Sequence, residues 1–302
     1  MFNKGLEENA EFVSYHPLIN LLYFILVIVV TMFSLSPFFL GATFAAAWAY
    51  YLLLKGKKTL KTGLFLCVSV VIVMVAINMF FNNNGATVLF YINSNRITLE
   101  SVCYGVASAV MLVSVIMWFS CFNVIMTSDK LIYVFGKAAP VLGLTLSMIF
   151  RFIPLLKNRF TEISLGQRCM GRGYSQGSLP IRTRQLLKEI SILIAWSLEA
   201  SIESADSMEA RGYGLKGRTS FHLFKFSARD IECAALMLAS GIPVLIGCVK
   251  GLTDMYFYPR LLPPEMNLTV AVMLACYGIL LVIPLIIDVT GEIRWRQSGL
   301  KI

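Results

Sequence analysis

The stretch Leu60–Phe81 reads LKTGLFLCVSVVIVMVAINMFF, and its 22 residues carry a single charge, on Lys61. A transmembrane α-helix needs about 20 mostly apolar residues, because each residue rises about 1.5 Å and the hydrocarbon core is about 30 Å thick. This stretch therefore predicts a helix that crosses a membrane.

Five further stretches share this apolar character and approach or exceed the same length. They are about Pro17–Leu35, Pro37–Leu54, Leu99–Met126, Ile231–Gly251 and Met266–Ile287. Of the 302 residues, 57% are hydrophobic and only 14% are charged, which excludes an ordinary soluble domain. We predict an all-α polytopic membrane protein with about six transmembrane helices and additional cytoplasmic helices.

The basic residues predict the orientation of the chain. A compact turn before the first quoted stretch holds Lys55, Lys57 and Lys58, and cytoplasmic loops are enriched in such residues. Counting spans from this turn places both termini and the long segment Thr127–Arg229 in the cytoplasm. That segment has 15 Lys and Arg and 7 acidic residues, a net charge of +8. Basic residues between spans indicate the cytoplasmic side more often than a nucleic-acid site, so we expect no nucleic-acid partner.

The chain is thus predicted to have three parts. Residues 1–126 form a membrane domain with four spans, 127–229 a cytoplasmic or interfacial domain, and 230–302 a membrane domain with two spans. Residues 138–156 are apolar but contain Pro140, Arg151 and Pro154. We interpret them as a kinked helix that lies along or dips into the inner leaflet, with Arg151 at the interface or, alternatively, facing a partner; the alternative for the whole stretch is a further span.

Two cytoplasmic helices are predicted next, from about Arg159 to Cys169 and from about Arg182 to Arg211. The second runs into Ile202–Phe221, read as IESADSMEARGYGLKGRTSF. Glycine just after the last turn is a common way to end a helix, so Arg211 is predicted on the final turn between Ala210 and Gly212. A cation there suits the negative end of the helix dipole, and a guanidinium can pair bidentately with a carboxylate of another protein.

The sequence offers no enzyme site. Gly212–Thr219 matches G-x-G-x-x-G, but nucleotide motifs need a strand before the loop and a helix after it, and here a helix comes first. The seven cysteines are scattered without a C-x-x-C pair, and the two histidines lie far apart. We therefore expect no metal site, no cofactor and no catalytic residues.

Four stretches resemble one family, the transmembrane T subunits of energy-coupling factor transporters. They are TLESVCYG (Thr98–Gly105), MTSDKLIYVFGKAAP (Met126–Pro140), RFIPLL (Arg151–Leu156) and ADSMEARGYG (Ala205–Gly214). The resemblance implies a multi-pass subunit of a bacterial cell membrane. It further implies two ATPase subunits and a small substrate-binding S subunit as partners, and uptake of a vitamin or a metal ion.

In that family, two cytoplasmic helices each end in an Ala-Arg-Gly motif whose arginine docks on an ATPase subunit. By resemblance, Ala210, Arg211 and Gly212 form the second motif. The first departs from the pattern, because Met170 stands where the arginine before Gly171 is expected. Arg172, between Gly171 and Gly173, is our candidate for the replacement, and Arg168 is the alternative.

Two other classes of protein stay open at this point. A stand-alone permease or secondary carrier would need a polar site near the middle of the membrane, and a membrane-embedded enzyme would need clustered polar residues at the ends of spans. Ionisable residues in the predicted spans are confined to their ends: Glu100, Lys250 and Asp288.

Overall fold

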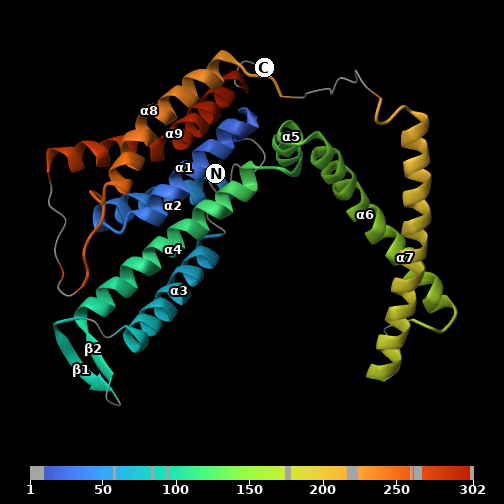
Figure 1. Ribbon diagram of the computed structural model, residues 1–302, viewed down its shortest axis with the longest axis horizontal. Coiled ribbons are helices and arrows are strands. Elements are labelled where there is room, and N and C mark those ends of the chain that lie inside the picture. The colour runs from blue at the N-terminus through green and yellow to red at the C-terminus, as the bar shows by residue number, and fades with distance from the viewer. Residues whose placement is uncertain are drawn as a thin grey trace. The chain divides into compact units, whose positions relative to one another are not determined.

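A computed structural model describes residues 10–56, 59–82, 85–92, 95–173, 178–215, 224–258, 261 and 267–299. Within these ranges the chain is almost entirely α-helical, which confirms the predicted fold class (Figure 1). The chain divides into two compact units. The first comprises residues 1–127 and 224–302, and the second comprises residues 128–223. The three functional domains proposed from the sequence stay a prediction.

Among its described residues, the first unit contains six long helices and a small hairpin. Its elements are η1 (Glu11–Ser14), α1 (Pro17–Phe33), α2 (Pro37–Lys55), α3 (Leu60–Phe81), β1 (Val88–Ile92), β2 (Asn95–Thr98), α4 (Leu99–Ile125), α8 (Ala228–Val249) and α9 (Leu268–Gly299). The strands β1 and β2 pair antiparallel and join α3 to α4, which pack side by side (Figure 1). The apolar outer face of α3 remains exposed, with Phe65 at 76% and Phe81 at 86%, as suits a helix that faces lipid.

An aromatic cluster forms the core of the first unit. Trp118 of α4 is fully buried, and its ring lies 5.8 Å from Tyr23, 6.2 Å from Phe24 and 6.0 Å from Tyr50, measured between ring centroids. Aromatic pairs at these separations add attraction beyond their buried area. The cluster therefore joins α1, α2 and α4 into one body.

Buried polar contacts attach α9 to the same body. The hydroxyl of Tyr277 lies 2.7 Å from Thr43 Oγ1 and 3.2 Å from Thr31 Oγ1. Asp288 accepts hydrogen bonds from the Phe12 amide at 2.7 Å and from the Tyr50 hydroxyl at 2.9 Å. Helix α9 continues beyond Asp288 to Gly299 and buries this carboxylate against η1 and α2, and the expectation that Asp288 lies at the end of the span stays a prediction.

Six helices are long and apolar enough to cross a membrane, by length and composition, among the residues described. They are 37–55, 60–81, 99–125, 140–169, 228–249 and 268–295. The number of candidate spans equals the predicted number, but the helices that qualify are not the same six stretches. Helix α1 has 17 residues and is shorter than the other spans, whereas α6, in the second unit, satisfies both criteria.

The second unit consists of α5 (Ser128–Ala138), α6 (Pro140–Cys169) and α7 (Leu179–Ala210). We expected a kinked helix over 138–156 and a separate helix from Arg159, and the structure corrects this with one continuous helix through Pro154. A proline removes one backbone hydrogen bond, and the leucine, isoleucine, lysine and arginine residues around it are compatible with a helix. The second predicted helix is confirmed as α7, which begins three residues earlier than expected.

Candidate functional site

The end of α6 has a well-defined backbone geometry. Met170 is the last residue of near-helical conformation, and Gly171 follows with a positive φ of 71°. The Gly171 amide donates to the Arg168 carbonyl at 3.0 Å, and the Arg172 amide donates to the Gln167 carbonyl at 2.9 Å. These two bonds define a Schellman cap, which needs the left-handed residue that glycine supplies without strain.

The end of α7 repeats this geometry. Arg211 has φ −84° and ψ 7°, almost the values of Met170, and Gly212 follows with φ 76°. The Gly212 amide donates to Glu209 at 2.9 Å, and the Tyr213 amide donates to Met208 at 3.0 Å. The two helices therefore end in the same Schellman cap, although their sequences share little besides the glycine.

The matching caps define which positions correspond. Met170 corresponds to Arg211, Gly171 to Gly212, and Arg172 to Tyr213. The first helix end thus lacks an arginine at the position that carries one in the second, as the sequence indicated. Arg172 lies three residues beyond the end of α6, so its side chain leaves the backbone at a different point from that of Arg211.

All three candidate arginines, Arg168, Arg172 and Arg211, have exposed side chains. The stem of Arg168 lies against Gly173, where an added Cβ would come within 2.6 Å of Arg168 Cγ. Arg172 instead lines a cavity of about 600 Å³ where the end of α6 meets the start of α7. Arg172 is therefore better placed than Arg168 to meet an incoming group.

This cavity is rich in positive charge. Its charged lining comes from Arg172, Arg184 and Lys188, and its remaining lining is Gln167, Pro180, Ile181 and Gln185. No acidic side chain lines it among the described residues. Sequence reasoning missed Arg184 and Lys188. Their spacing of four residues, which places both on one face of a helix, was the available signal.

Two polar groups near this cavity have no hydrogen-bond partner within the part of the chain that the structure describes. They are the side-chain oxygen of Gln185 and the carboxylate of Glu189, which is 1% exposed. A buried acceptor without a donor costs about 1–3 kcal/mol. This region is therefore polar and incompletely satisfied.

Helices α6 and α7 pack antiparallel. Residues near the end of α6 meet the start of α7 at the basic cavity, and Arg151 of α6 lines a second cavity, of about 340 Å³, with Trp196 and Glu203 of α7. Arg151 therefore faces α7 at this point, and whether it also lies at the membrane interface stays a prediction.

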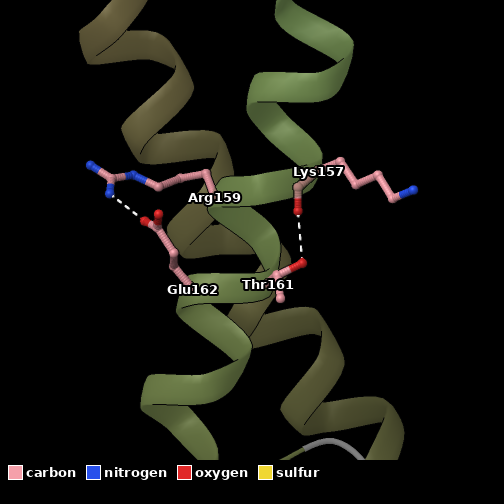
Figure 2. A network of polar contacts seen from close by, with 4 residues as sticks. All are labelled: Lys157, Arg159, Thr161 and Glu162. Carbon is pink, nitrogen blue, oxygen red and sulfur yellow. Dashed lines mark hydrogen bonds and ion pairs between the residues drawn. The ribbon is translucent and has the colours of Figure 1, made fainter.

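A cation–π contact fixes the middle of this pair of helices. The Arg159 guanidinium lies 4.8 Å from the centre of the Trp196 ring and also bonds Glu162 at 2.6 Å, a contact that Figure 2 shows. In the same view the Lys157 side chain extends away from this pair, and the hydrogen bond drawn at Lys157 runs from the Thr161 hydroxyl to its backbone carbonyl.

The antiparallel packing places the two capped ends far apart. The cap of α6 lies beside the start of α7, and the second cap lies at the other end of the same helix. At 1.5 Å per residue, the 32 residues of α7 span about 48 Å. The second unit thus presents two exposed, similarly built helix ends separated by about the length of α7.

We predict that Gly212→Ala loosens the second cap. A side chain at φ 76° costs about 1–2 kcal/mol, and the new Cβ would also come within 2.9 Å of Leu215 Cδ1. Hydrogen exchange of the Tyr213 amide should become about 5–30 times faster. Gly166→Ala is the matched control, because its Cβ meets nothing within 4 Å and the helix should tolerate it. Equal exchange in both variants would contradict this role of Gly212.

The fold and the composition define a polytopic all-α membrane protein whose second unit carries two basic, glycine-capped helix ends. No family model matches the chain. The relatives nevertheless share one name, and the chain is similar to the transmembrane proteins EcfT of energy-coupling factor transporters.

The match to the EcfT protein of Streptococcus thermophilus is 26% identical over 242 residues and covers 75% of this chain and 90% of that relative. Shorter matches are 32% identical over 107 residues to a protein of Listeria monocytogenes and 34% over 105 residues to one of Bacillus selenitireducens. These cover 40% and 39% of the relatives. The family resemblance stated from the sequence is thereby confirmed.

Proposed function

We propose that this chain is the coupling subunit of an energy-coupling factor importer. In this proposal it passes the motion of two ATPase subunits to a small S subunit in the membrane, which binds the vitamin or metal ion. The chain itself contributes no catalytic group. The observation that carries the proposal is the pair of matching caps at the ends of α6 and α7.

The spacing of the caps supports two docking points. Their separation, about 48 Å along α7, exceeds what one groove on one small domain could accommodate. Two ATPase subunits side by side would each receive one helix end. A continuous helix is a suitable element for transmitting displacement, because all of its internal backbone groups are hydrogen-bonded.

The positive charges at the two helix ends support acidic grooves on the ATPase subunits as the surfaces that receive them. At the second end, Arg211 stands exposed beside Ala210 and the Gly212 turn, so its guanidinium is accessible for a bidentate carboxylate pair. At the first end, Arg172, Arg184 and Lys188 would together receive an acidic side chain. Such pairs are strong when water is excluded, which a contact that transmits force requires.

Affinity purification of the tagged chain from its native membranes tests the proposal. Two ATPase subunits and a small membrane protein should co-purify, and the ATPases should be lost after Arg211→Glu. Purification of the chain alone, with substrate transport retained in vesicles without ATP, would instead support a stand-alone carrier and refute the proposal.

A native cysteine tests the proposed orientation, with the second unit and both termini in the cytoplasm. Cys169, the last residue of α6, is exposed and lies next to the first cap. We expect a membrane-impermeant maleimide to label it in inside-out vesicles and not in intact cells. Cys169→Ser provides the control for labelling of the other cysteines. Labelling of Cys169 in intact cells would place α6 across the membrane and its end outside.

A further inference from the structure

The first unit contains a groove that the proposed function does not use. It lies between α8 and α9, has a volume of about 600 Å³, and is lined at one end by Tyr15. Its walls are apolar, formed mainly by Leu236 of α8 and by Ile279, Val282 and Ile286 of α9. All of these residues lie in one compact unit, so the groove belongs to a single packed body.

The groove has a polar mouth and an apolar interior. Arg229 and Glu232 line it from the first two turns of α8, which is a candidate membrane span from its first residue. Helix α9 packs against α8, and the deeper part of the groove is lined by Leu236 and Gly278. Measured along the helix axes at 1.5 Å per residue, the groove is roughly 10–14 Å deep. That depth is close to the thickness of one leaflet's hydrocarbon, about 15 Å.

The dimensions favour a hydrocarbon chain over a protein helix. A volume of about 600 Å³ over this depth corresponds to a cross-section of roughly 50 Å². An α-helix with side chains is about 10–12 Å wide and therefore needs roughly 80–110 Å². A whole transmembrane helix would therefore lie over the groove, whereas a hydrocarbon chain is narrow enough to lie within it.

Gly278 creates the deep part of this space. A Cβ added there would meet no atom within 4 Å, so open space adjoins the helix backbone. The residues of α9 that line the groove next to Gly278, Ile279 and Val282, carry bulky apolar side chains. The missing side chain at this position therefore leaves a channel between them.

The mouth carries one charge of each sign. Arg229 and Glu232 are both exposed, and neither forms an ion pair in the part of the chain that the structure describes. Tyr15 adds a hydroxyl group to the same end, and partial burial raises the pKa of Tyr15, so this hydroxyl keeps its proton. A headgroup with a phosphate for Arg229 and an ammonium for Glu232 would match these charges.

We propose that this groove holds one acyl chain of a phospholipid whose headgroup carries a phosphate and an ammonium group, as in phosphatidylethanolamine. The phosphate lies at Arg229 and Tyr15, the ammonium at Glu232, and the acyl chain runs past Leu236 to Gly278. The proposal does not depend on the transport function. A single lipid held here would fill the groove between α8 and α9, with its headgroup at the end that Tyr15 lines.

The test counts the lipids that the purified full-length chain retains from vesicles of equal phosphatidylethanolamine and phosphatidylglycerol, by native mass spectrometry. Gly278→Phe places an aromatic ring in the deep end, where an added Cβ meets nothing within 4 Å, and should lower retained phosphatidylethanolamine at least tenfold. Gly41→Phe is the matched control, because Gly41 lies in span α2 and its added Cβ likewise meets nothing within 4 Å. Equal retention in the two variants would overturn the proposal.

A second arm tests the headgroup. Glu232→Gln should lower the retained ratio of phosphatidylethanolamine to phosphatidylglycerol at least fivefold, and Arg229→Ala should lower retention of both. Both residues are exposed, so folding should be unaffected. An unchanged ratio in Glu232→Gln would refute the headgroup assignment. Loss of a co-purifying membrane protein from Gly278→Phe, with lipid retention unchanged, would show that a protein helix occupies this face.

Discussion

Arg211→Glu should abolish ATP-driven uptake while the protein remains inserted in the membrane at normal levels. If Arg211 pairs with a carboxylate on an ATPase subunit, the change places two negative groups against each other in a contact closed to water. Removing one partner of a buried ion pair costs about 3–5 kcal/mol. That cost corresponds to a loss of about 10²–10³ in affinity for the ATPase subunit, or more.

Two variants make this result specific. Lys157→Glu makes the same change of charge in the same unit, on a side chain that extends away from the Arg159–Glu162 pair, and should leave uptake within about twofold of the wild type (Figure 2). Arg211→Lys keeps the charge but loses the two parallel donors, and should retain only part of the activity. Normal uptake by Arg211→Glu would contradict the assigned role.

The first helix end should depend on Arg172. Because Arg172 lines the basic cavity with Arg184 and Lys188, Arg172→Glu should reduce uptake by about 10²-fold, on the same energetic grounds. Arg168→Glu should have a smaller effect, because the Arg168 stem lies against Gly173 rather than in that cavity.

A rescue experiment and a comparison of two variants test whether Arg172 or Arg168 docks on the ATPase subunit. The caps show that position 170 corresponds to position 211, so Met170→Arg places a guanidinium where the second helix end carries one. In an Arg172→Ala background, Met170→Arg should restore uptake. A larger loss from Arg168→Glu than from Arg172→Glu would show that Arg168 is the docking residue. Rate of uptake at saturating ATP is the measurement in both cases.

The parts of the fold that follow from local sequence were predicted well. Helix α3 runs over Leu60–Phe81, the range expected from its uninterrupted apolar run. Helix α6 was divided wrongly, because Pro154 and the charges after it suggested a boundary. A proline inside a helix removes one hydrogen bond, but the helix can continue where the residues around the proline favour helix. Sequence rules do not say which of these two effects is larger at Pro154.

The candidate site was predictable only in part. The glycines marked both helix ends, and the mismatch at Met170 was visible in the sequence. The sequence does not show that the two helix ends have the same cap geometry. The backbone hydrogen bonds of the structure show it, and they also show that Met170 corresponds to Arg211. Arg184 and Lys188 lie on α7, whereas Arg172 follows the end of α6, so only the folded hairpin brings the three cations together.

Photo-crosslinking from the two helix ends tests the central claim most directly. A photoreactive phenylalanine analogue at Met170 or Tyr213, both exposed next to a cap, samples what each end touches in native membranes. The account predicts crosslinks to ATPase subunits from both positions, and none from the same analogue at Phe65 on the lipid-facing side of α3. Crosslinks from Met170 and Tyr213 to lipid alone, or to no nucleotide-hydrolysing protein, would contradict it.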